Sequence, residues 1–556
     1  MNRDPGGVSE PDTPPPTSTV DPAPLPGGAR AATTAQRVLG ILVTLIAFWT
    51  VIVLPLRVIS VGYRPTDDAR RHVAKVLSGK AWSEILVLRP EATVDSHPGW
   101  HALLSTAKRA GVTTGVGLIV VSSVALGTLF LMAPLLLRFG REEAWLLALL
   151  VTAVGTDHLF RRIFIGRPFV FAMSVLVALA VLWPRLRGVR TPRGPWIALA
   201  ALFSLSVWIH GSWYLWALPL AAFAVAGEFR VAARVGTALV VGTLAGAALT
   251  GSPVEFLGQT LRHPLWAIAT DLPKRVLVFE FQPFDGEPWM VAATLALIAW
   301  RRARSDLSIP LANDPVFVLA AAGWALGFHT QRFWWDWGLP ACMVWMAKEL
   351  DVALARIPRY SRRRLWSTVA IAAVLFLAVT NDRQSRWSSS ESSAFLSRDN
   401  AEHRAWLPAP GGVLYSNDMR VFYNTFWRNP QADWRYVLGF EPALMPLDDL
   451  AVYRRIQLEY ASEASFAPWV AKLRPADRLI VVRSSGGAPR IPVLEWHSPY
   501  RGMWIGRLPA NGASATPTRT GSAPPDMATA DPLEAGEIRD AESYDGLEST
   551  AAGDSD

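Results

Sequence analysis

Cysteine is almost absent from this sequence, which holds one, Cys342, among its 556 residues. A single cysteine excludes an intrachain disulfide, and no Cys/His spacing typical of a zinc site occurs. Walker, GxSxG and Gly-rich dinucleotide-binding motifs are also missing. These absences argue against an ATP-driven pump and against a soluble enzyme that uses nucleotide sugars, whereas a secondary transporter stays open as an alternative.

Charge is missing from several long segments. No charged residue occurs in Val38–Leu54, Gly111–Leu137, Phe169–Trp183 or Ala370–Val379. The chain as a whole is 51% hydrophobic, which is too apolar for an ordinary soluble protein of this length. Because a helix needs about 20 apolar residues to cross the hydrocarbon core, we predict an α-helical polytopic membrane protein.

The apolar segments predict about 11 transmembrane helices when tilt and short flanks are allowed. The expected spans are 38–59, 112–137, 142–156, 167–184, 195–210, 212–227, 231–250, 288–301, 313–328, 335–350 and 364–380. With the N-terminus in the cytoplasm, every inner loop is basic, which is the positive-inside pattern. We interpret the net charge of +8 as this topology signal and not as a sign of nucleic-acid binding.

Composition divides the rest of the chain. Residues 1–36 are rich in Pro, Thr, Ala and Gly and predict a disordered cytoplasmic tail, followed by an uncleaved signal anchor. Residues 37–380 form the transmembrane domain, whose first outer loop is 60–111. Residues 508–556 are acidic and rich in small residues, and they predict a second disordered tail.

Residues 381–507 predict a small extracytoplasmic α/β domain. The segments 411–417 and 477–484 are typical of strands, and 447–461 is typical of a helix. Since this region follows the last expected span, it is placed on the outer side of the membrane.

An acidic pair, Asp67 and Asp68, opens the first outer loop. His72 lies four residues after Asp68, so both share a face if the segment is helical. A carboxylate here could act as a general base or bind a divalent metal. The alternative is a helix cap, because Thr66-Asp67-Asp68 before an apolar-periodic run is a good helix start.

The same loop contains Asp95, His97 and His101 within "DSHPGWHALL". His97 and His101 are four residues apart, as helical metal ligands can be. An interfacial helix is the competing interpretation, because Trp and His are common there. We expect these side chains to contact a substrate and do not assign them a metal.

Three arginines, Arg161, Arg162 and Arg167, are close-set in a short outer loop, where the positive-inside rule disfavours them. Arginine binds phosphate through bidentate hydrogen bonds. The alternative is snorkelling to the membrane interface. The position on the wrong side of the membrane favours phosphate binding.

Further polar groups gather at the expected outer face. "WIHGSW" turns at Gly211 and presents His210, and "EFQPFDGEP" offers Glu280 and Gln282. "HTQRFWWDWGLP" places Arg332 and Asp336 among tryptophans at a helix start. Tryptophans there typically form an interface belt, whereas a charged residue at the mouth of a membrane helix is a candidate for function.

These elements, taken in order, resemble the GT-C superfamily of membrane glycosyltransferases, and locally a group of largely uncharacterised bacterial GT-C-like proteins. The resemblance covers about residues 38–500. Its motifs are Asp68/His72, Arg167-Pro168, Ile209-His210-Gly211-Ser212, Glu280-Phe281-Gln282-Pro283, Arg332 and the segment "YVLGFEP" at 436–442. The sequence departs from the group in "DDARRH", where arginines stand in place of aromatic residues.

The resemblance implies a multi-pass protein of the bacterial cytoplasmic membrane that transfers a sugar from a polyprenyl-phosphate-linked donor to a cell-envelope acceptor. Asp68 would be the base that activates the acceptor, and the arginines would bind the donor phosphate. No DxD-type metal triad is visible, so no cofactor is assigned, with a divalent metal left open.

Two other functions remain as alternatives: a secondary transporter or flippase for a lipid-linked or anionic substrate, and a non-catalytic membrane scaffold. A transporter is expected to show broken helices near mid-membrane and paired halves. The candidates Asp68, Arg167, His210, Glu280 and Arg332 discriminate between these functions. Their convergence on one outer site favours an enzyme, and their scatter favours a scaffold.

Overall fold

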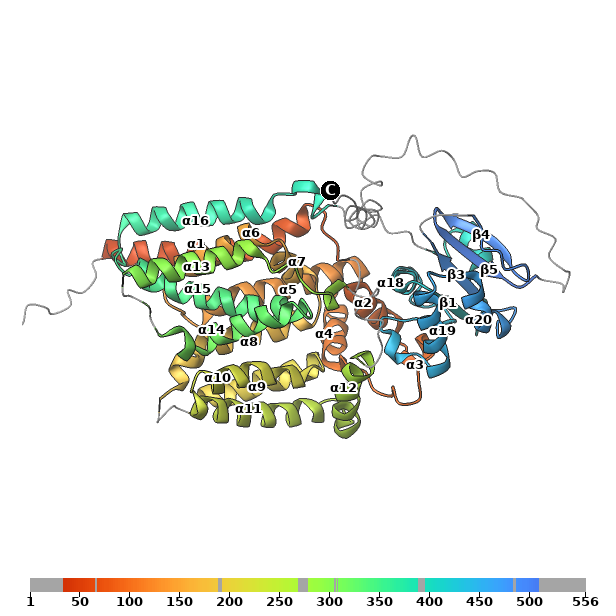
Figure 1. Cartoon of the computed structure of the whole chain (residues 1–556). Helices are drawn as coiled ribbons and strands as arrows, with labels where there is room; N and C mark the ends of the chain where they lie inside the picture. The colour runs from red at the N-terminus through yellow and green to blue at the C-terminus, as the bar shows by residue number, and fades with distance from the viewer. Residues whose placement is uncertain are drawn as a thin grey trace, which may run out of the picture.

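The computed structural model describes residues 34–65, 68–188, 193–268, 279–304, 307, 309–388, 396–483 and 487–509. These residues form a helix bundle and, at one end of it, a smaller domain built on a sheet (Figure 1). Asp67, nearly all of the expected N-terminal tail and most of the C-terminal tail lie outside the described residues.

A helix lies at each of the eleven expected spans. They are α1 (Thr34–Ser60), α5 (Gly115–Leu136), α6 (Glu142–Gly155), α8 (Phe169–Leu186), α9 (Arg193–Ile209), α10 (Ala217–Val225), α11 (Phe229–Ala248), α13 (Pro288–Ala303), α14 (Pro315–Gly327), α15 (Leu339–Leu354) and α16 (Arg362–Thr380).

Five of these helices, α1, α5, α8, α11 and α16, are long and apolar enough to cross a membrane. A sixth span results if α6 and α7 (His158–Phe164), which meet at 110°, count as one. The chain therefore has several candidate spans among its described residues, while the count of about 11 stays a prediction. Because of this bend, α7 lies across the end of the bundle, and Arg161 and Arg162 of α7 are located there.

The short helices of the outer loops lie at the end of the bundle that faces the sheet domain (Figure 1). They are α2 (Asp68–Ser78), α4 (Pro98–Arg109) and α12 (Pro253–Ile268), whereas α3 (Trp82–Ile85) lies within the sheet domain (Figure 1). The sequence indicated helices at α2 and α4, but α12 was not expected. Two irregular segments complete this end, a 3-10 turn at Phe279–Phe281 and a π-helical turn at Trp334–Gly338.

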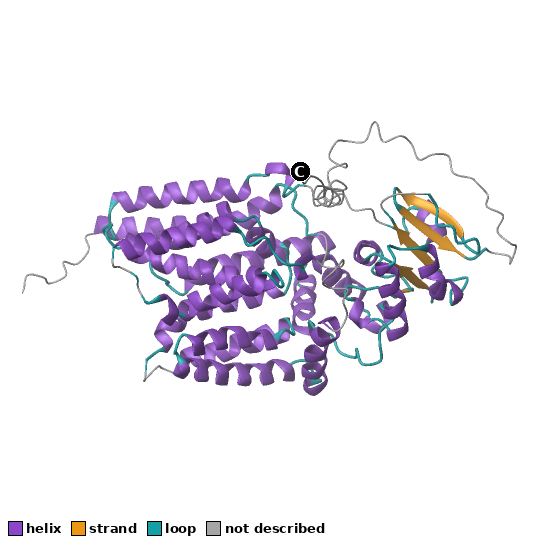
Figure 2. Ribbon diagram, viewed as in Figure 1, coloured by secondary structure: helices purple, strands orange, loops and turns teal. Residues whose placement is uncertain are grey.

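The smaller domain, which the sequence predicts on the outer side and which is called the outer domain below, contains one five-stranded sheet in the order β2-β1-β3-β5-β4 (Figure 2). The strands are β1 (Val413–Ser416), β2 (Arg435–Tyr436), β3 (Arg478–Val482), β4 (Glu495–Tyr500) and β5 (Met503–Arg507). β1 pairs in parallel with β2 and β3, whereas β5 is antiparallel to β3 and β4. Four helices pack around it: α17 (Ala401–Trp406), α18 (Met419–Arg428), α19 (Leu447–Leu458) and α20 (Ala467–Ala471). The strands and the helix expected from the sequence are confirmed.

The first outer loop packs into this domain. Leu86 forms an isolated bridge to Tyr436, and the Val87 N–H donates to the Tyr436 carbonyl at 2.9 Å. Ile85 and Leu86 are buried in one cluster with Phe422 of α18. The first loop and the C-terminal region therefore pack together at one end of the bundle.

Candidate functional site

Asp68, the first residue of α2, lies where the bundle meets the outer domain. Its Oδ1 accepts hydrogen bonds from Nε of Arg71 at 2.5 Å and from the hydroxyl of Tyr423 at 3.3 Å. Its Oδ2 lies 3.5 Å from Nε of Arg167. These contacts hold the carboxylate from both sides. It is still accessible, because 22% of the side chain is exposed.

Arg167 joins Asp68 to a second group of charges. Nη1 of Arg167 and Nη1 of Arg162 both donate to Oε1 of Glu280. Arg162 also makes a bidentate pair with Asp336 at 2.6 and 2.9 Å. Nε of Arg332 lies 3.2 Å from Asp336 and 3.6 Å from Glu280. We call this set the arginine–carboxylate cluster; its members are Asp68, Arg71, Arg162, Arg167, Glu280, Arg332 and Asp336.

The cluster contains four guanidinium groups and three carboxylates. Although burial opposes the charge of Asp68, Arg71 and Arg167 hold the pKa of its carboxyl well below the usual range. Burial also opposes the charge of Glu280, but the surrounding arginines lower its pKa to about 2. Both carboxylates are therefore ionised at neutral pH, and the excess positive charge suits an anion.

A glycine turn positions Arg167, and a π-helical turn positions Asp336. Gly166 has φ +69°, and a Cβ there would meet Oγ of Ser123 at 2.8 Å, so the turn that delivers Arg167 favours glycine. Asp336 lies in the π-helical turn and is 2% exposed. Such turns interrupt an α-helix and often mark functional sites. Here the turn directs Asp336 to Arg162 of α7.

A group of histidines lies beside the cluster, beginning with His72, one helical turn along α2 from Asp68. Nδ1 of His72 lies 2.9 Å from Nε2 of His101, and Nδ1 of His101 lies 2.5 Å from Oδ2 of Asp95. The ring centroid of His97 lies 4.9 Å from those of His72 and His210. Burial, with Arg71 next, lowers the pKa of His72 well below its usual value, so this imidazole is neutral at neutral pH.

The turn at His210 is built against the first outer loop. The Gly211 N–H donates to the Ser96 carbonyl at 3.2 Å. A Cβ on Gly211 would lie 2.5 Å from Cγ2 of Thr260 and 3.2 Å from that carbonyl oxygen. Glycine is therefore required for the close approach that brings His210 beside His97.

The structure brings together most of the site residues expected from the sequence. Asp68, Arg162, Arg167, Glu280, Arg332 and Asp336 meet in the arginine–carboxylate cluster, and His72, Asp95, His97, His101 and His210 meet beside it. Arg161 is exposed on α7 and is not part of the contacts described here. Gln282 supports the site through its backbone, because its carbonyl accepts the Gln331 N–H at 2.9 Å.

Two residues of the site were not expected. Arg71 is one helical turn from Asp68, and the i,i+3 spacing was the available signal. Tyr423 of α18 comes from the outer domain, and nothing in its local sequence indicates a contact with the first loop.

The charge balance does not suit a bound cation. Among the described residues, no group of three His, Cys, Asp or Glu side chains is arranged to hold a metal ion. Each carboxylate of the cluster already faces at least one guanidinium. A divalent cation prefers several oxygen ligands at once, and here it must compete with arginine for each of them.

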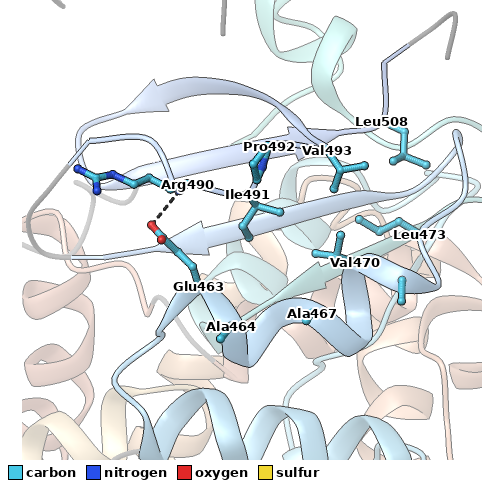
Figure 3. Close-up of a pocket in the computed structure, with 11 residues that line it drawn as sticks. Glu463, Ala464, Ala467, Val470, Leu473, Arg490, Ile491, Pro492, Val493 and Leu508 are labelled. Carbon is cyan, nitrogen blue, oxygen red and sulfur yellow. Dashed lines mark hydrogen bonds between the residues drawn. The ribbon is translucent and has the colours of Figure 1, made fainter. Parts of the chain in front are cut away.

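A cavity of about 550 Å³ lies between the first outer loop and the outer domain. Its wall includes Asp95, His97, Trp82 and Phe440, so it reaches the histidines from outside. A second cavity of about 620 Å³ lies within the outer domain (Figure 3). That one is lined mostly by aliphatic side chains around Val470 and contains none of the expected site residues.

Comparison with known proteins gives matches among solved structures only. No family model matches this chain, and no curated protein matches it. Two solved structures of the Archaeoglobus fulgidus oligosaccharyltransferase are similar at 12% identity. One, tethered to an acceptor peptide containing the NVT sequon, has a TM-score of 0.46 over 80% of this chain and 68% of that chain. The other, a complex with Zn and sulfate, has a TM-score of 0.45 over 85% and 74%. A likeness at this identity and TM-score does not establish a shared function, so the GT-C resemblance stays a prediction.

Proposed function

We propose that this chain is a membrane glycosyltransferase that transfers a sugar from a polyprenyl-phosphate-linked donor to a cell-envelope acceptor on the outer face of the bacterial cytoplasmic membrane. The observation that carries the proposal is the convergence of Arg162, Arg167 and Arg332 on the same small region as Asp68. Such convergence supports an enzyme over a scaffold, whose outer face needs no shared centre.

The donor phosphate is held by the arginines. Arg332 makes longer ion pairs, at 3.2 Å to Asp336 and 3.6 Å to Glu280. This guanidinium group can turn to a phosphate at low cost, whereas Arg162 and Arg167 are both held by Glu280. As the bond between the sugar C1 and the phosphate oxygen breaks, the electron pair stays on the phosphate. The arginines stabilise that developing charge.

Asp68 is the catalytic carboxylate of this proposal. It lies between Arg167 on the donor side and Tyr423 of the outer domain. In that position an ionised carboxylate orients the acceptor hydroxyl toward C1 and stabilises the positive charge that develops on the sugar. The new bond forms between the acceptor oxygen and C1 on the face opposite the departing phosphate.

The test is transfer of radiolabelled sugar from polyprenyl-phosphate donors in membranes that contain the wild type or Asp68→Asn. We expect the variant to lose transfer while its thermal unfolding stays close to that of the wild type. Asp433→Asn is the matched control, because Asp433 is 65% exposed and makes one surface ion pair with Lys80. Full transfer by Asp68→Asn contradicts the role of this carboxylate. Uptake or flipping of the donor without transfer favours the transporter.

A further inference from the structure

We propose that His72, His101 and Asp95 form a proton relay, in which Nε2 of His72 takes the proton of the acceptor hydroxyl. This inference rests on the proposed transferase function and names the base for that site. It replaces the expectation that Asp68 is the base, and Asp68 keeps its role in orienting the acceptor.

The relay is continuous and spans three elements. His72 of α2 contacts His101 of α4 at 2.9 Å, and His101 contacts Asp95 of the preceding loop at 2.5 Å. The loop is held in place because Oδ1 of Asp95 accepts the His97 N–H at 3.0 Å. The remaining oxygen, Oδ2, is therefore the one that faces His101.

The charge of Asp95 sets the proton positions along the relay. Burial opposes its ionisation, but His101 and His97 hold the pKa of its carboxyl below the usual range, so it is an ionised acceptor. Nδ1 of His101 must then carry the hydrogen. In neutral His101 the other nitrogen, Nε2, accepts, so Nδ1 of His72 donates. Nε2 of His72 is left with a free lone pair.

That lone pair lies in a buried position. His72 is 0% exposed, and its Nε2 has no hydrogen-bond partner among the described residues. A buried polar atom without a partner costs free energy, which identifies it as a candidate for a functional contact. His72 is one helical turn from Asp68, so a hydroxyl held by that carboxylate lies on the same face of α2.

Positive and neutral groups around His72 prevent the proton from staying there. The groups that face it are Arg71 of its own helix, His97 and His101 of the first loop and α4, and His210 of the turn after α9. All of them disfavour a charge on His72. At the far end, Nδ1 of His101 lies 2.5 Å from the carboxylate of Asp95. The proton therefore moves along the relay, away from His72 and toward Asp95.

The step is balanced. The O–H bond of the acceptor breaks and its proton binds Nε2 of His72, while the hydrogen on Nδ1 of His72 passes to Nε2 of His101. The acceptor oxygen forms its bond to C1, and the electron pair of the broken C1–O bond leaves on the phosphate. Asp95 is 26% exposed and lines the 550 Å³ cavity, so the proton leaves to solvent on the outer side.

The first test is chemical rescue. His72→Ala is expected to lose at least about a hundredfold in kcat with little change in the KM for the donor, and added imidazole is expected to restore part of the rate. His497→Gln in the outer domain, whose ring stacks on Trp406, is the matched histidine control. A loss of less than about fivefold, or no rescue at any imidazole concentration, overturns the assignment of His72.

The second test separates the relay from a structural role. Asp95 stabilises the protonated relay, so Asp95→Asn is expected to move the acid limb of the pH–rate profile to lower pH and to lower the plateau. An unshifted limb overturns the relay. If the wild type transfers sugar and His72→Ala is fully active, the relay fails while the transferase function stands.

A third measurement does not depend on activity. In NMR spectra of protein labelled with ¹⁵N-histidine, the ¹⁵N chemical shifts of the His72 ring are expected to show a neutral imidazole with hydrogen on Nδ1 and none on Nε2. A spectrum with hydrogen on Nε2 of His72 overturns the proposal even if no donor supports transfer.

Discussion

Arg167 contacts two carboxylates that belong to different outer loops: its Nε lies 3.5 Å from Oδ2 of Asp68, and its Nη1 donates to Oε1 of Glu280. In the proposed function, one guanidinium thus joins Asp68, assigned to the acceptor, to Glu280 on the side assigned to the donor. Arginine suits this position because its planar fork presents donors in two directions, which a lysine ammonium cannot reproduce.

Substitution of Arg167 is expected to reduce transfer more than it reduces stability. Loss of a charge-assisted hydrogen bond costs about 1.5–3 kcal/mol, which corresponds to about a 10- to 150-fold loss in kcat/KM for Arg167→Gln. Arg167→Lys keeps the charge and loses the fork, so it is expected to remain impaired. The measurement is the rate of sugar transfer at several donor concentrations.

Arg420→Gln is the control for this series, because Arg420 is 79% exposed and pairs with Asp418 on the surface of the outer domain. If Arg167→Lys transfers sugar as fast as the wild type, the forked contact is not required and the proposed role of Arg167 is wrong.

Gly211→Ala is expected to destabilise the site. The added Cβ would lie 2.5 Å from Cγ2 of Thr260, and such overpacking costs about 1–3 kcal/mol. Displacement of the turn also moves His210 away from His97. Thermal unfolding and sugar transfer are therefore both expected to decrease.

Two further variants sharpen this prediction. Gly194→Ala is the control, since no atom lies within 4 Å of the corresponding Cβ. In the double variant with Thr260→Ser, the clashing methyl is gone while the hydroxyl that accepts from Trp213 remains, so part of the stability is expected to return. Equal unfolding temperatures for Gly211→Ala and Gly194→Ala contradict the steric argument.

The sequence could predict the helices and much of the site for different reasons. Apolar runs long enough to span a membrane predict where helices form, and short apolar runs in the C-terminal region predict β1 and β3. The motifs around Asp68, Arg167 and Glu280 were visible because charge is unusual at a membrane mouth. The sequence did not show which arginine pairs with which carboxylate, because the distances between them depend on how the loops fold.

What the sequence could not predict is set by packing between distant segments. Tyr423 reaches Asp68 because α18 packs against α2, and Arg70 donates to Asn424 at 3.1 Å in the same interface. No local pattern specifies which turn of one helix faces which turn of another. The link from His72 to His101 was missed for the same reason, although both histidines were candidates.

Chelation of divalent metal is expected to leave transfer unchanged. The carboxylates of the cluster are paired with arginines, which compete with a cation for them. The guanidinium groups can bind the phosphate of the proposed donor directly, so no bridging cation is needed. The measurement compares transfer before and after treatment with EDTA and then with added Mg²⁺ or Mn²⁺. Activity that is lost with EDTA and restored by either metal contradicts this prediction and directs attention to Asp68 as a ligand.

The folded protein is expected to lose stability as the pH falls below about 6.5. Burial is the main cause that lowers the pKa of His72 and His97 in the folded state, whereas an unfolded chain has an ordinary histidine pKa of about 6.5. Below that pH the unfolded state binds more protons, so the free energy of unfolding decreases as the pH falls. Each such histidine contributes up to about 1.4 kcal/mol per pH unit.

The check is the thermal unfolding midpoint in detergent between pH 7.0 and pH 5.0, above the range where the paired carboxylates titrate. His72→Asn removes one of the buried groups, so its midpoint is expected to fall less steeply with pH than that of the wild type, whatever its value at pH 7.0. His329→Gln is the control because His329 is exposed, and its slope is expected to match the wild type. If His72→Asn follows the wild-type slope, then His72 takes up its proton in the folded state as readily as in the unfolded state. A neutral, buried imidazole with a free lone pair would then not exist at this position.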